Sequence, residues 1–182
     1  IPTGQVSGQG VSGGLAQIIA NNQPVDEYYL KKFKGYDQSG QQIIEDTASF
    51  CGDPNPHVLL GISTTLNYKQ FSLTLNAGGA YDYLVYNNTH NTVTNIGVIT
   101  KGLNTDAEAL HSQESTSDGV AASSRYLESG NYFKLRNATL NYHLGNIGGL
   151  FKDCNVYVSG TNLFVLTKFT GFDPEVNVDK NN

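Results

Sequence analysis

Three pairs of neighbouring acidic residues are the strongest candidates for catalytic chemistry in this sequence. They are Asp26/Glu27, Glu45/Asp46 and Asp173/Glu175. Glycoside hydrolysis needs two carboxyl groups about 5 to 9.5 Å apart that flank the bond to be cleaved. All three pairs stand beside residues typical of turns or loops, and no pattern places them in a cleft. The acidic pairs therefore do not predict catalysis.

The other reactive side chains are dispersed along the chain. The two cysteines form no C-x-x-C motif, and no G-x-S-x-G, H-E-x-x-H or phosphate-loop motif is present. The histidines share no spacing typical of metal ligands: His57, His90, His111 and His143. We predict no catalytic residue, no metal site and no cofactor, so that the protein is not an enzyme.

The C-terminal residues leave one metal alternative open. Oxygen-bearing side chains recur there at every second position, as calcium ligands do in some loops. They are Asp173, Glu175, Asn177, Asp179 and Asn181. No glycine or closing glutamate follows them, which favours a solvated loop over a calcium site.

Aromatic and amide side chains suggest a ligand-binding site instead. Sugars are commonly held between aromatic platforms and amide hydrogen bonds. One short stretch supplies both kinds of group and gives our candidate ligand-binding residues: Tyr81, Tyr83, Tyr86, Asn87 and Asn88. The alternative for the tyrosines is an aromatic girdle at a membrane interface, and the pattern favours it.

The elements that would position these residues begin with a long hairpin. Apolar residues occupy alternate positions over 60–68 and again over 71–83, with Lys69 and Gln70 between the two runs. Alternation with period two over this length predicts two antiparallel strands joined by a tight turn.

The polar face of this hairpin is neutral, with small hydroxyl and amide side chains. Soluble antiparallel sheets usually place Lys and Glu on the wet face. Neutral small residues are typical of a face that lines a polar lumen, and tyrosines at the strand ends are typical of a lipid-facing strand. The open alternative is a soluble β-sandwich, either a ligand-binding module or an adhesin.

The remaining segments are less regular. We predict a short helical turn over 15–20, a strand over 27–33, a loop over 52–56, and strands over 138–144 and 155–168 joined by a connection at 146–153. Residues 87–126 read as a long, nearly featureless polar loop with a short helix near 106–111. Short turns alternating with long loops are the layout of outer-membrane barrels.

Composition excludes other classes. The 182 residues carry a net charge of -5, and only 15% are charged, so the basic stripe of a nucleic-acid-binding protein is absent. No apolar run reaches the roughly 18 residues of a membrane-spanning helix. The chain has no methionine and begins at Ile1, so we expect a piece of a longer protein.

Several segments resemble one family. The segments that carry the resemblance are GDPNP at 52–56, YFKLRNATLNY at 132–142, and VYVSGTNLF followed by TGFDPEV. They resemble the C-terminal barrel of SusC/RagA-type TonB-dependent transporters. The resemblance is collinear and covers most of the chain, with the exception of 87–126.

The resemblance implies a fold and a function. Residues 1–182 would be the C-terminal segment of a 22-stranded, all-β antiparallel barrel in the outer membrane of a Gram-negative bacterium, with the plug domain and the last strand missing. The whole transporter would import glycans or peptides with a SusD-like surface lipoprotein and the TonB complex, and 87–126 would be an extracellular loop. Outer-membrane lipid would surround the barrel, and no nucleic acid would be bound.

The barrel reading makes two structural predictions. Cys51 and Cys154 would lie on opposite sides of the membrane, about 25 Å apart, and so could not form a disulfide. Five outward side chains would face lipid and be exposed in this chain, whereas a sandwich would bury them: Leu60, Ile62, Leu66, Leu73 and Leu75.

Overall fold

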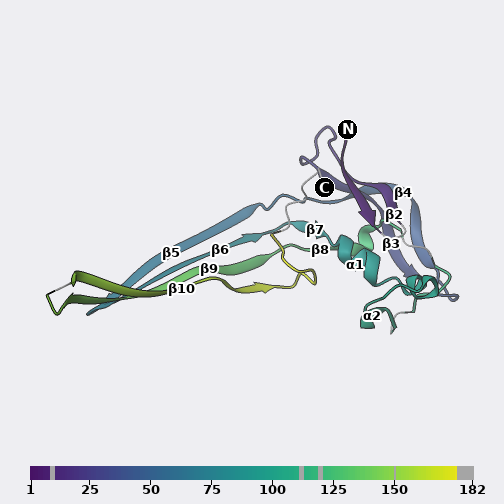
Figure 1. Ribbon diagram of the computed structural model, residues 1–182. Helices are drawn as coiled ribbons and strands as arrows, with labels where there is room; N and C mark the ends of the chain where they lie inside the picture. The colour runs from purple at the N-terminus through teal and green to yellow at the C-terminus, as the bar shows by residue number, and fades with distance from the viewer. Residues whose placement is uncertain (9–10, 111–112, 119–120, 150, 176–182) are drawn as a thin grey trace. The chain divides into compact units, whose positions relative to one another are not determined.

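The computed structural model describes residues 1–8, 11–110, 113–118, 121–149 and 151–175 (Figure 1). Its strands pair antiparallel in three sheets. The chain divides into two compact units. The first unit comprises 1–56, 83–130 and the chain from 169 onward, and the second unit comprises 57–82 and 131–168.

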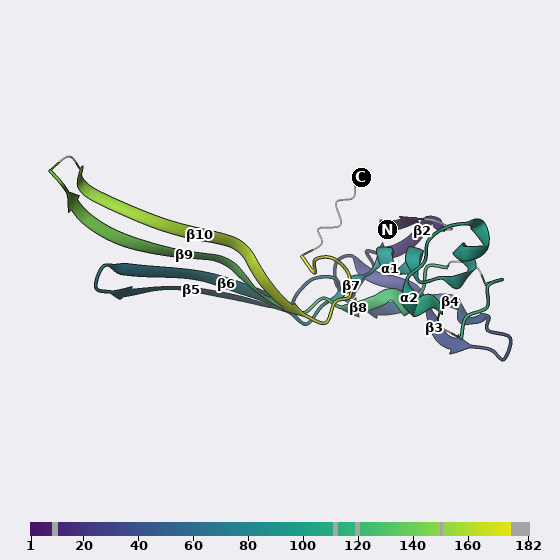
Figure 2. The same ribbon diagram turned by 60° about the horizontal axis from the view of Figure 1, so that its bottom comes forward.

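The second unit is a four-stranded sheet made of two long hairpins (Figure 2). Strand β5 (Val58–Tyr68) turns at Lys69 and Gln70 into β6 (Phe71–Tyr81). Strands β9 (Tyr132–Ile147) and β10 (Phe151–Thr167) form the other hairpin, and the sheet order is β10-β9-β6-β5. The predicted hairpin at 60–83 is confirmed, although its second strand stops at Tyr81. Asp82 adopts a left-handed backbone conformation, with φ of 63°, which ends the strand.

The register of the second unit sorts its side chains onto two faces. Residues directly opposite each other on neighbouring strands share a face, and side chains alternate along each strand. One face carries an unbroken apolar row across all four strands: Leu66, Leu73, Leu140 and Val158. The neighbouring row on the other face is entirely hydroxylic: Thr65, Thr74, Thr139 and Ser159.

The first unit contains a four-stranded sheet, ordered β1-β2-β3-β4, and a short two-stranded ladder. The four strands are β1 (Pro2–Gly8), β2 (Val11–Ile18), β3 (Glu27–Tyr36) and β4 (Gln42–Gly52). The ladder joins β7 (Leu84–Tyr86) to β8 (Leu127–Ser129). The predicted helical turn at 15–20 is wrong, because residues 11–18 form β2. Strand 27–33 is confirmed and continues to Tyr36.

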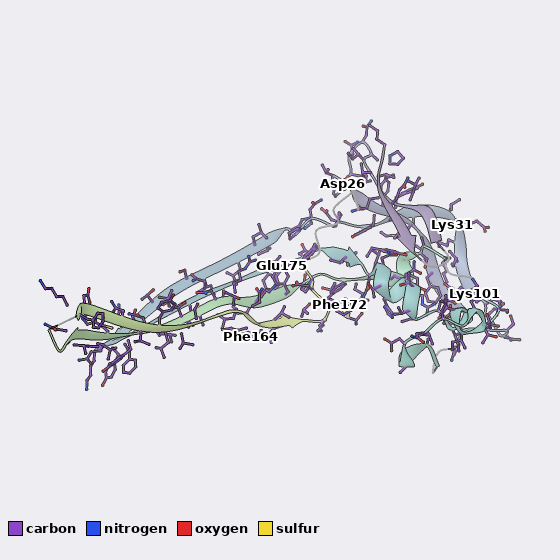
Figure 3. The ribbon with its side chains drawn as sticks, in the orientation of Figure 1. Asp26, Lys31, Lys101, Phe164, Phe172 and Glu175 are labelled. Carbon is purple, nitrogen blue, oxygen red and sulfur yellow. The ribbon has the colours of Figure 1, made fainter. Side chains whose placement is uncertain are left out.

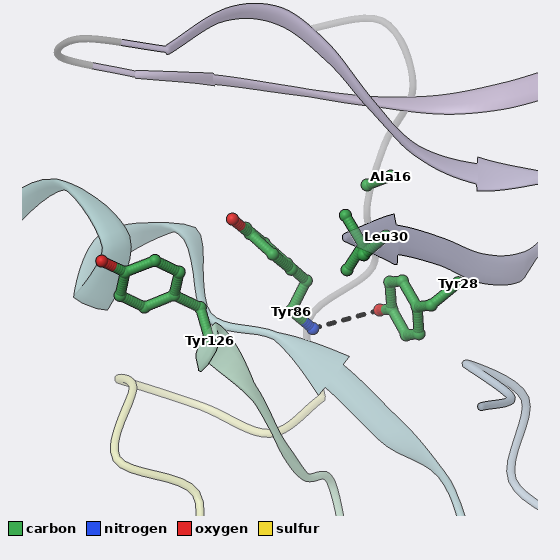
Figure 4. Close-up of a cluster of buried hydrophobic side chains, with 5 residues drawn as sticks. All are labelled: Ala16, Tyr28, Leu30, Tyr86 and Tyr126. Atoms are coloured by element: carbon green, nitrogen blue, oxygen red, sulfur yellow. Dashed lines mark hydrogen bonds between the residues drawn. The ribbon is translucent and has the colours of Figure 1, made fainter. Parts of the chain in front are cut away.

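The core of the first unit consists mainly of tyrosine rings (Figure 4). Tyr28, Tyr86 and Tyr126 are buried with Leu30 and Ala16, and the ring of Tyr86 meets that of Tyr126 edge-on at 6.2 Å. The backbone N–H of Tyr86 donates to the Tyr28 hydroxyl at 3.1 Å. Burial raises the pKa of Tyr28 to about 12, so its hydroxyl stays protonated in neutral solution. Because Tyr86 is the last residue of β7, this core fixes the end of β7 and the point where the segment 87–126 begins.

The segment 87–126 is folded, which corrects the prediction of a nearly featureless loop. It contains α1 (Asn88–Val93), η1 (Ile96–Lys101), α2 (Ala107–Leu110) and η2 (Ser124–Tyr126). The side chains of Asn87 and Asn95 cap the first two helices by accepting from backbone N–H groups. The short helix predicted near 106–111 corresponds to α2, while His111 lies outside the described residues. No described helix is long and apolar enough to span a membrane.

Arg125 attaches this segment to β3 and is held in place by a buried ion pair. Arg125 donates to Glu114 at 3.0 Å, and the Glu114 side chain is fully buried. The Arg125 guanidinium also lies 5.1 to 5.5 Å from the ring centres of Phe33, Tyr36 and Tyr126. Arginine over aromatic faces gains from the ring quadrupole, most strongly where water is excluded. Arg125 is therefore fixed against β3 by packing and charge together.

Two further predictions have clear outcomes. The connection predicted at 146–153 is shorter than expected, because β9 continues to Ile147 and β10 begins at Phe151. Cys51 and Cys154 are both free thiols, as predicted.

Candidate functional site

The five candidate ligand-binding residues do not form one cluster. Tyr81 ends β6 in the second unit, and the other four belong to the first unit. Tyr86 is buried in the core, Tyr83 donates its hydroxyl to the carbonyl of Pro174, and Asn88 begins α1. Of the five, Asn87 lines a pocket in the first unit.

This pocket has a volume of about 420 Å³, which lies within the range of small-molecule sites. Its walls come from α1, the 104–106 segment and the 170–172 segment. Half of the lining residues carry an amide or a hydroxyl group, and two carry rings, His90 and Phe172. The lining residues are Asn87, Thr89, His90, Val93, Asn104, Thr105, Asp106, Thr170, Gly171 and Phe172. We call this the Asn87 pocket.

Glu128 organises one wall of the Asn87 pocket. Its carboxylate accepts from the Thr170 backbone N–H at 2.8 Å and from the Thr170 hydroxyl at 2.7 Å. It also accepts from the Asn87 amide at 2.9 Å and lies 3.1 Å from His90 Nδ1. Burial raises the pKa of Glu128, but these hydrogen bonds outweigh burial and hold it below its ordinary value of 4.5. The side chain is therefore ionised at neutral pH and ties β8 to α1 and to the 169–172 segment.

Phe172 stands out because a large apolar ring is almost fully exposed beside a pocket, at 95% of its maximum (Figure 3). The backbone around it is held on both sides. Glu128 binds Thr170, and the Asp173 carboxylate accepts from the Glu175 N–H at 2.9 Å. Gly171 packs closely against the ring of Phe169, which would have to shift if a larger residue replaced the glycine. The ring is thus presented by an ordered turn.

Sequence reasoning missed His90, Glu128, Thr170 and Phe172 as members of one site. They lie up to about eighty positions apart in the sequence and meet only through the β7–β8 ladder and the Glu128 hydrogen bonds. The one available signal was the TGFDPEV stretch, which contains Thr170 and Phe172.

The second unit presents a polar face of a different kind. Its side chains hydrogen-bond to one another across strands: Ser63 donates to Asn76 at 2.7 Å, and the hydroxyls of Thr139 and Ser159 lie 2.8 Å apart. The opposite face is apolar and uncovered. Leu60, Ile62 and Leu66 are 43%, 47% and 58% exposed. Leu73 and Leu75 are half-buried, so none of the five predicted outward residues is buried as a sandwich would require.

The acidic pairs show no catalytic arrangement. Glu45 pairs with Lys34 at 2.7 Å on the surface, and the Asp173 carboxylate accepts from the backbone of its own turn. Within the described ranges, no group of three or more His, Cys, Asp or Glu residues is placed to hold a metal ion. Most of the calcium alternative falls at 176–182, outside the described residues.

The comparisons with known proteins agree with this two-faced sheet. No family model matches the chain. TonB-dependent receptor P26 of Formosa agariphila is 30% identical over 158 residues, covering 78% of this chain and 16% of the relative. The TonB-dependent receptor SusC of Bacteroides thetaiotaomicron is 24% identical over 173 residues, covering 86% of this chain and 16% of the relative.

A solved structure has the same fold. The structure of the RagAB peptide transporter superposes with a TM-score of 0.69 and 22% identity, over 88% of this chain and 22% of that one. This chain belongs to the family of TonB-dependent receptors. It spans 16 to 17% of the length of the curated receptors it matches. These relatives are named as receptors, in keeping with the prediction that the protein is not an enzyme.

As a SusC-type segment, the second unit is part of a barrel wall that this chain does not close. In such a wall the apolar face contacts lipid and the polar face lines the interior. The apolar side chains run from Val58 to Tyr68, ten steps of about 3.3 Å, or roughly 25 Å of membrane at the usual tilt of about 45°. An aromatic row closes one end of this band, where the rings of Phe71 and Tyr142 lie 4.6 Å apart.

Proposed function

We propose that this chain is the C-terminal part of an outer-membrane barrel, and that the full-length protein imports a nutrient across the outer membrane of a Gram-negative bacterium. The observation that carries the proposal is the two-faced second unit. Its apolar band has the height of the hydrocarbon layer, and its polar face is neutral and hydrogen-bonded. Named TonB-dependent receptors among the relatives support it.

The proposed import uses parts that lie outside this chain. TonB would supply the energy by acting on an N-terminal plug domain, and a SusD-like lipoprotein would capture the nutrient at the surface. The nutrient would be a glycan or a peptide; the RagAB structure is that of a peptide transporter. Within this chain, residues 87–126 would face the outside. Asn87 is the strongest of the five proposed ligand-binding residues, because it lines a pocket.

The test is growth and fractionation in the organism that carries the gene. We expect an antibody against residues 87–106 to detect a band several times heavier than this chain in the outer membrane, shifted by boiling as folded barrels are. Deleting the gene should abolish growth on one nutrient, and deleting tonB should have the same effect on that nutrient. A soluble band of the size of this chain, unchanged by boiling, would overturn the proposal.

A further inference from the structure

The Asn87 pocket is a built site. One of its walls is fixed by the Glu128 hydrogen bonds to Thr170, Asn87 and His90, and the exposed ring of Phe172 is among the residues that line it. A phenylalanine side chain has only two rotatable bonds, so the exposed ring loses little conformational entropy when a ligand fixes it. Aromatic and amide groups around a pocket of about 420 Å³ are the usual composition of a small-molecule site.

The charges of the pocket restrict the ligand. No lysine or arginine is among the described residues that line it, and the Nδ1 of its histidine, His90, already lies 3.1 Å from the Glu128 carboxylate. The pocket therefore presents no permanent cation to a sulfate, phosphate or carboxylate group. The carboxylate of Glu128 is already satisfied by three side chains and a backbone N–H. Asp106 adds a negative charge to the wall, and this charge repels anionic ligands further.

The remaining groups match an uncharged sugar ring. The faces of aromatic rings are negative and attract polarised hydrogens, which the C–H groups of a pyranose ring provide. Amide and hydroxyl groups such as Asn104 and Thr89 can exchange hydrogen bonds with sugar hydroxyls. A peptide would bring a charged terminus or several backbone groups, and no lysine or arginine among the described residues lines the pocket to pair with a C-terminal carboxylate.

We propose that the Asn87 pocket binds one unit of an uncharged oligosaccharide, with Phe172 as the stacking platform and Asn104 and Thr89 as hydrogen-bonding partners. This inference rests on the proposed import function and adds a site and a charge preference to it.

The experiment measures binding to the purified full-length protein in detergent by calorimetry. The probes are neutral oligosaccharides of four to eight glucose, mannose, xylose or galactose units, acidic oligosaccharides of the same length made of galacturonate or sulfated galactose, and pooled peptides of eight to twelve residues. We expect a neutral probe to bind. Phe172→Ala should weaken this binding about tenfold, and Asn104→Ala about fivefold.

Two matched variants test whether binding depends on the aromatic ring at position 172. Phe172→Tyr keeps an aromatic face and should bind like the wild type. Phe151→Ala removes an exposed ring at the start of β10, in the second unit, and should have no effect. Because Phe172 packs against little, its loss should leave the heat-modifiable band of the barrel unchanged, which shows that each variant is folded.

The outcomes separate the site from the import function. The site proposal fails if no neutral probe binds, if Phe172→Ala binds as the wild type does, or if the ring-dependent ligand is a peptide or an acidic sugar. TonB-dependent uptake that persists in any of these cases leaves the import function standing. A ring-dependent sugar affinity without any TonB-dependent uptake would keep the site and remove the import function.

Discussion

Glu128 shows how one side chain can connect segments that are distant in the sequence. It lies on β8 and binds Thr170, Asn87 and His90. Hydrogen bonds to an ionised group are each worth about 1.5 to 3 kcal/mol, roughly twice the value of neutral ones. The position of the 169–172 turn, and with it the Phe172 ring, therefore depends on the charge of this carboxylate.

Replacing Glu128 by Gln should loosen the 169–172 turn at neutral pH. The amide keeps one acceptor but loses the charge, so we expect the protection of the Thr170 N–H against hydrogen exchange to fall roughly 5- to 30-fold, or about 1 to 2 kcal/mol. Mass-spectrometric exchange of the full-length protein measures this. Glu45→Gln, which removes the charge from a surface pair with Lys34, is the control and should leave the turn unchanged.

The same carboxylate gives the turn a pH dependence of known sign. The pKa of Glu128 in the folded protein lies below its ordinary value of 4.5, so its stabilisation is complete above pH 4.5 and is lost as the pH falls through the folded pKa. The wild-type protection of Thr170, corrected for intrinsic exchange, should be constant from pH 7 to 5 and drop below that. Glu128→Gln should show no such drop, and a parallel drop in both proteins would contradict the assignment.

At the scale of elements, the register of the second unit decides which substitutions matter. Side chains on one face of a strand are separated by two residues, so neighbours in the sequence face opposite environments. On the apolar face, Leu75 lies opposite Thr64 and Ala138 near the middle of the band, whereas Val58 lies at one end. Both should contact lipid at different depths.

Leu75→Arg should destabilise the barrel by about 2 to 4 kcal/mol, because a charge near the bilayer midplane loses its hydration. Val58→Arg introduces the same charge on the same face near the interface and should cost about 0 to 1 kcal/mol. The folded fraction in membranes, read from the unboiled band on a gel, compares the two variants. Equal loss in both would mean that depth in a membrane is not the cause.

The prediction from the sequence agrees best with the structure for the hairpin of β5 and β6. Alternation over 60–68 and 71–81 is a local signal, and the strands, the turn and the outward set could all be predicted from it. The β2 strand was missed because glycines and a serine hide its periodicity. In 87–126 the short helix α2 was predicted, whereas α1, η1 and η2 were missed because each has six residues or fewer. In the pocket only Asn87 could be predicted, since its partners come from β8 and the 169–172 turn.

At the scale of the whole molecule, the sheet of the second unit ends in two lateral strands, β5 and β10. A lateral strand presents unpaired N–H and C=O groups, and neighbouring strands of the closed barrel would satisfy them. This unit also carries an exposed apolar face. Both features are suited to a barrel wall in lipid and unsuited to water.

Residues 1–182 expressed alone should therefore aggregate in detergent-free buffer, through edge pairing and the apolar face. Sedimentation velocity measures this directly, and the full-length protein in detergent, which should sediment as a single species, is the control. A monomeric and folded chain in buffer would instead favour the soluble binding module that the sequence left open.

The short β7–β8 ladder has a consequence for chain entropy. Strands β6 and β9 are neighbours in the sheet although fifty residues, 82–131, separate them in the sequence. Closing a flexible loop of that length would cost about 3 kcal/mol more than closing a two-residue turn. The ladder pairs Leu84 with Ser129, and Gly130 donates to Tyr83 at 3.0 Å, so the two ends are already joined just beyond the strands. The segment between them can vary in length and composition while the pairing of the sheet keeps the same entropic cost.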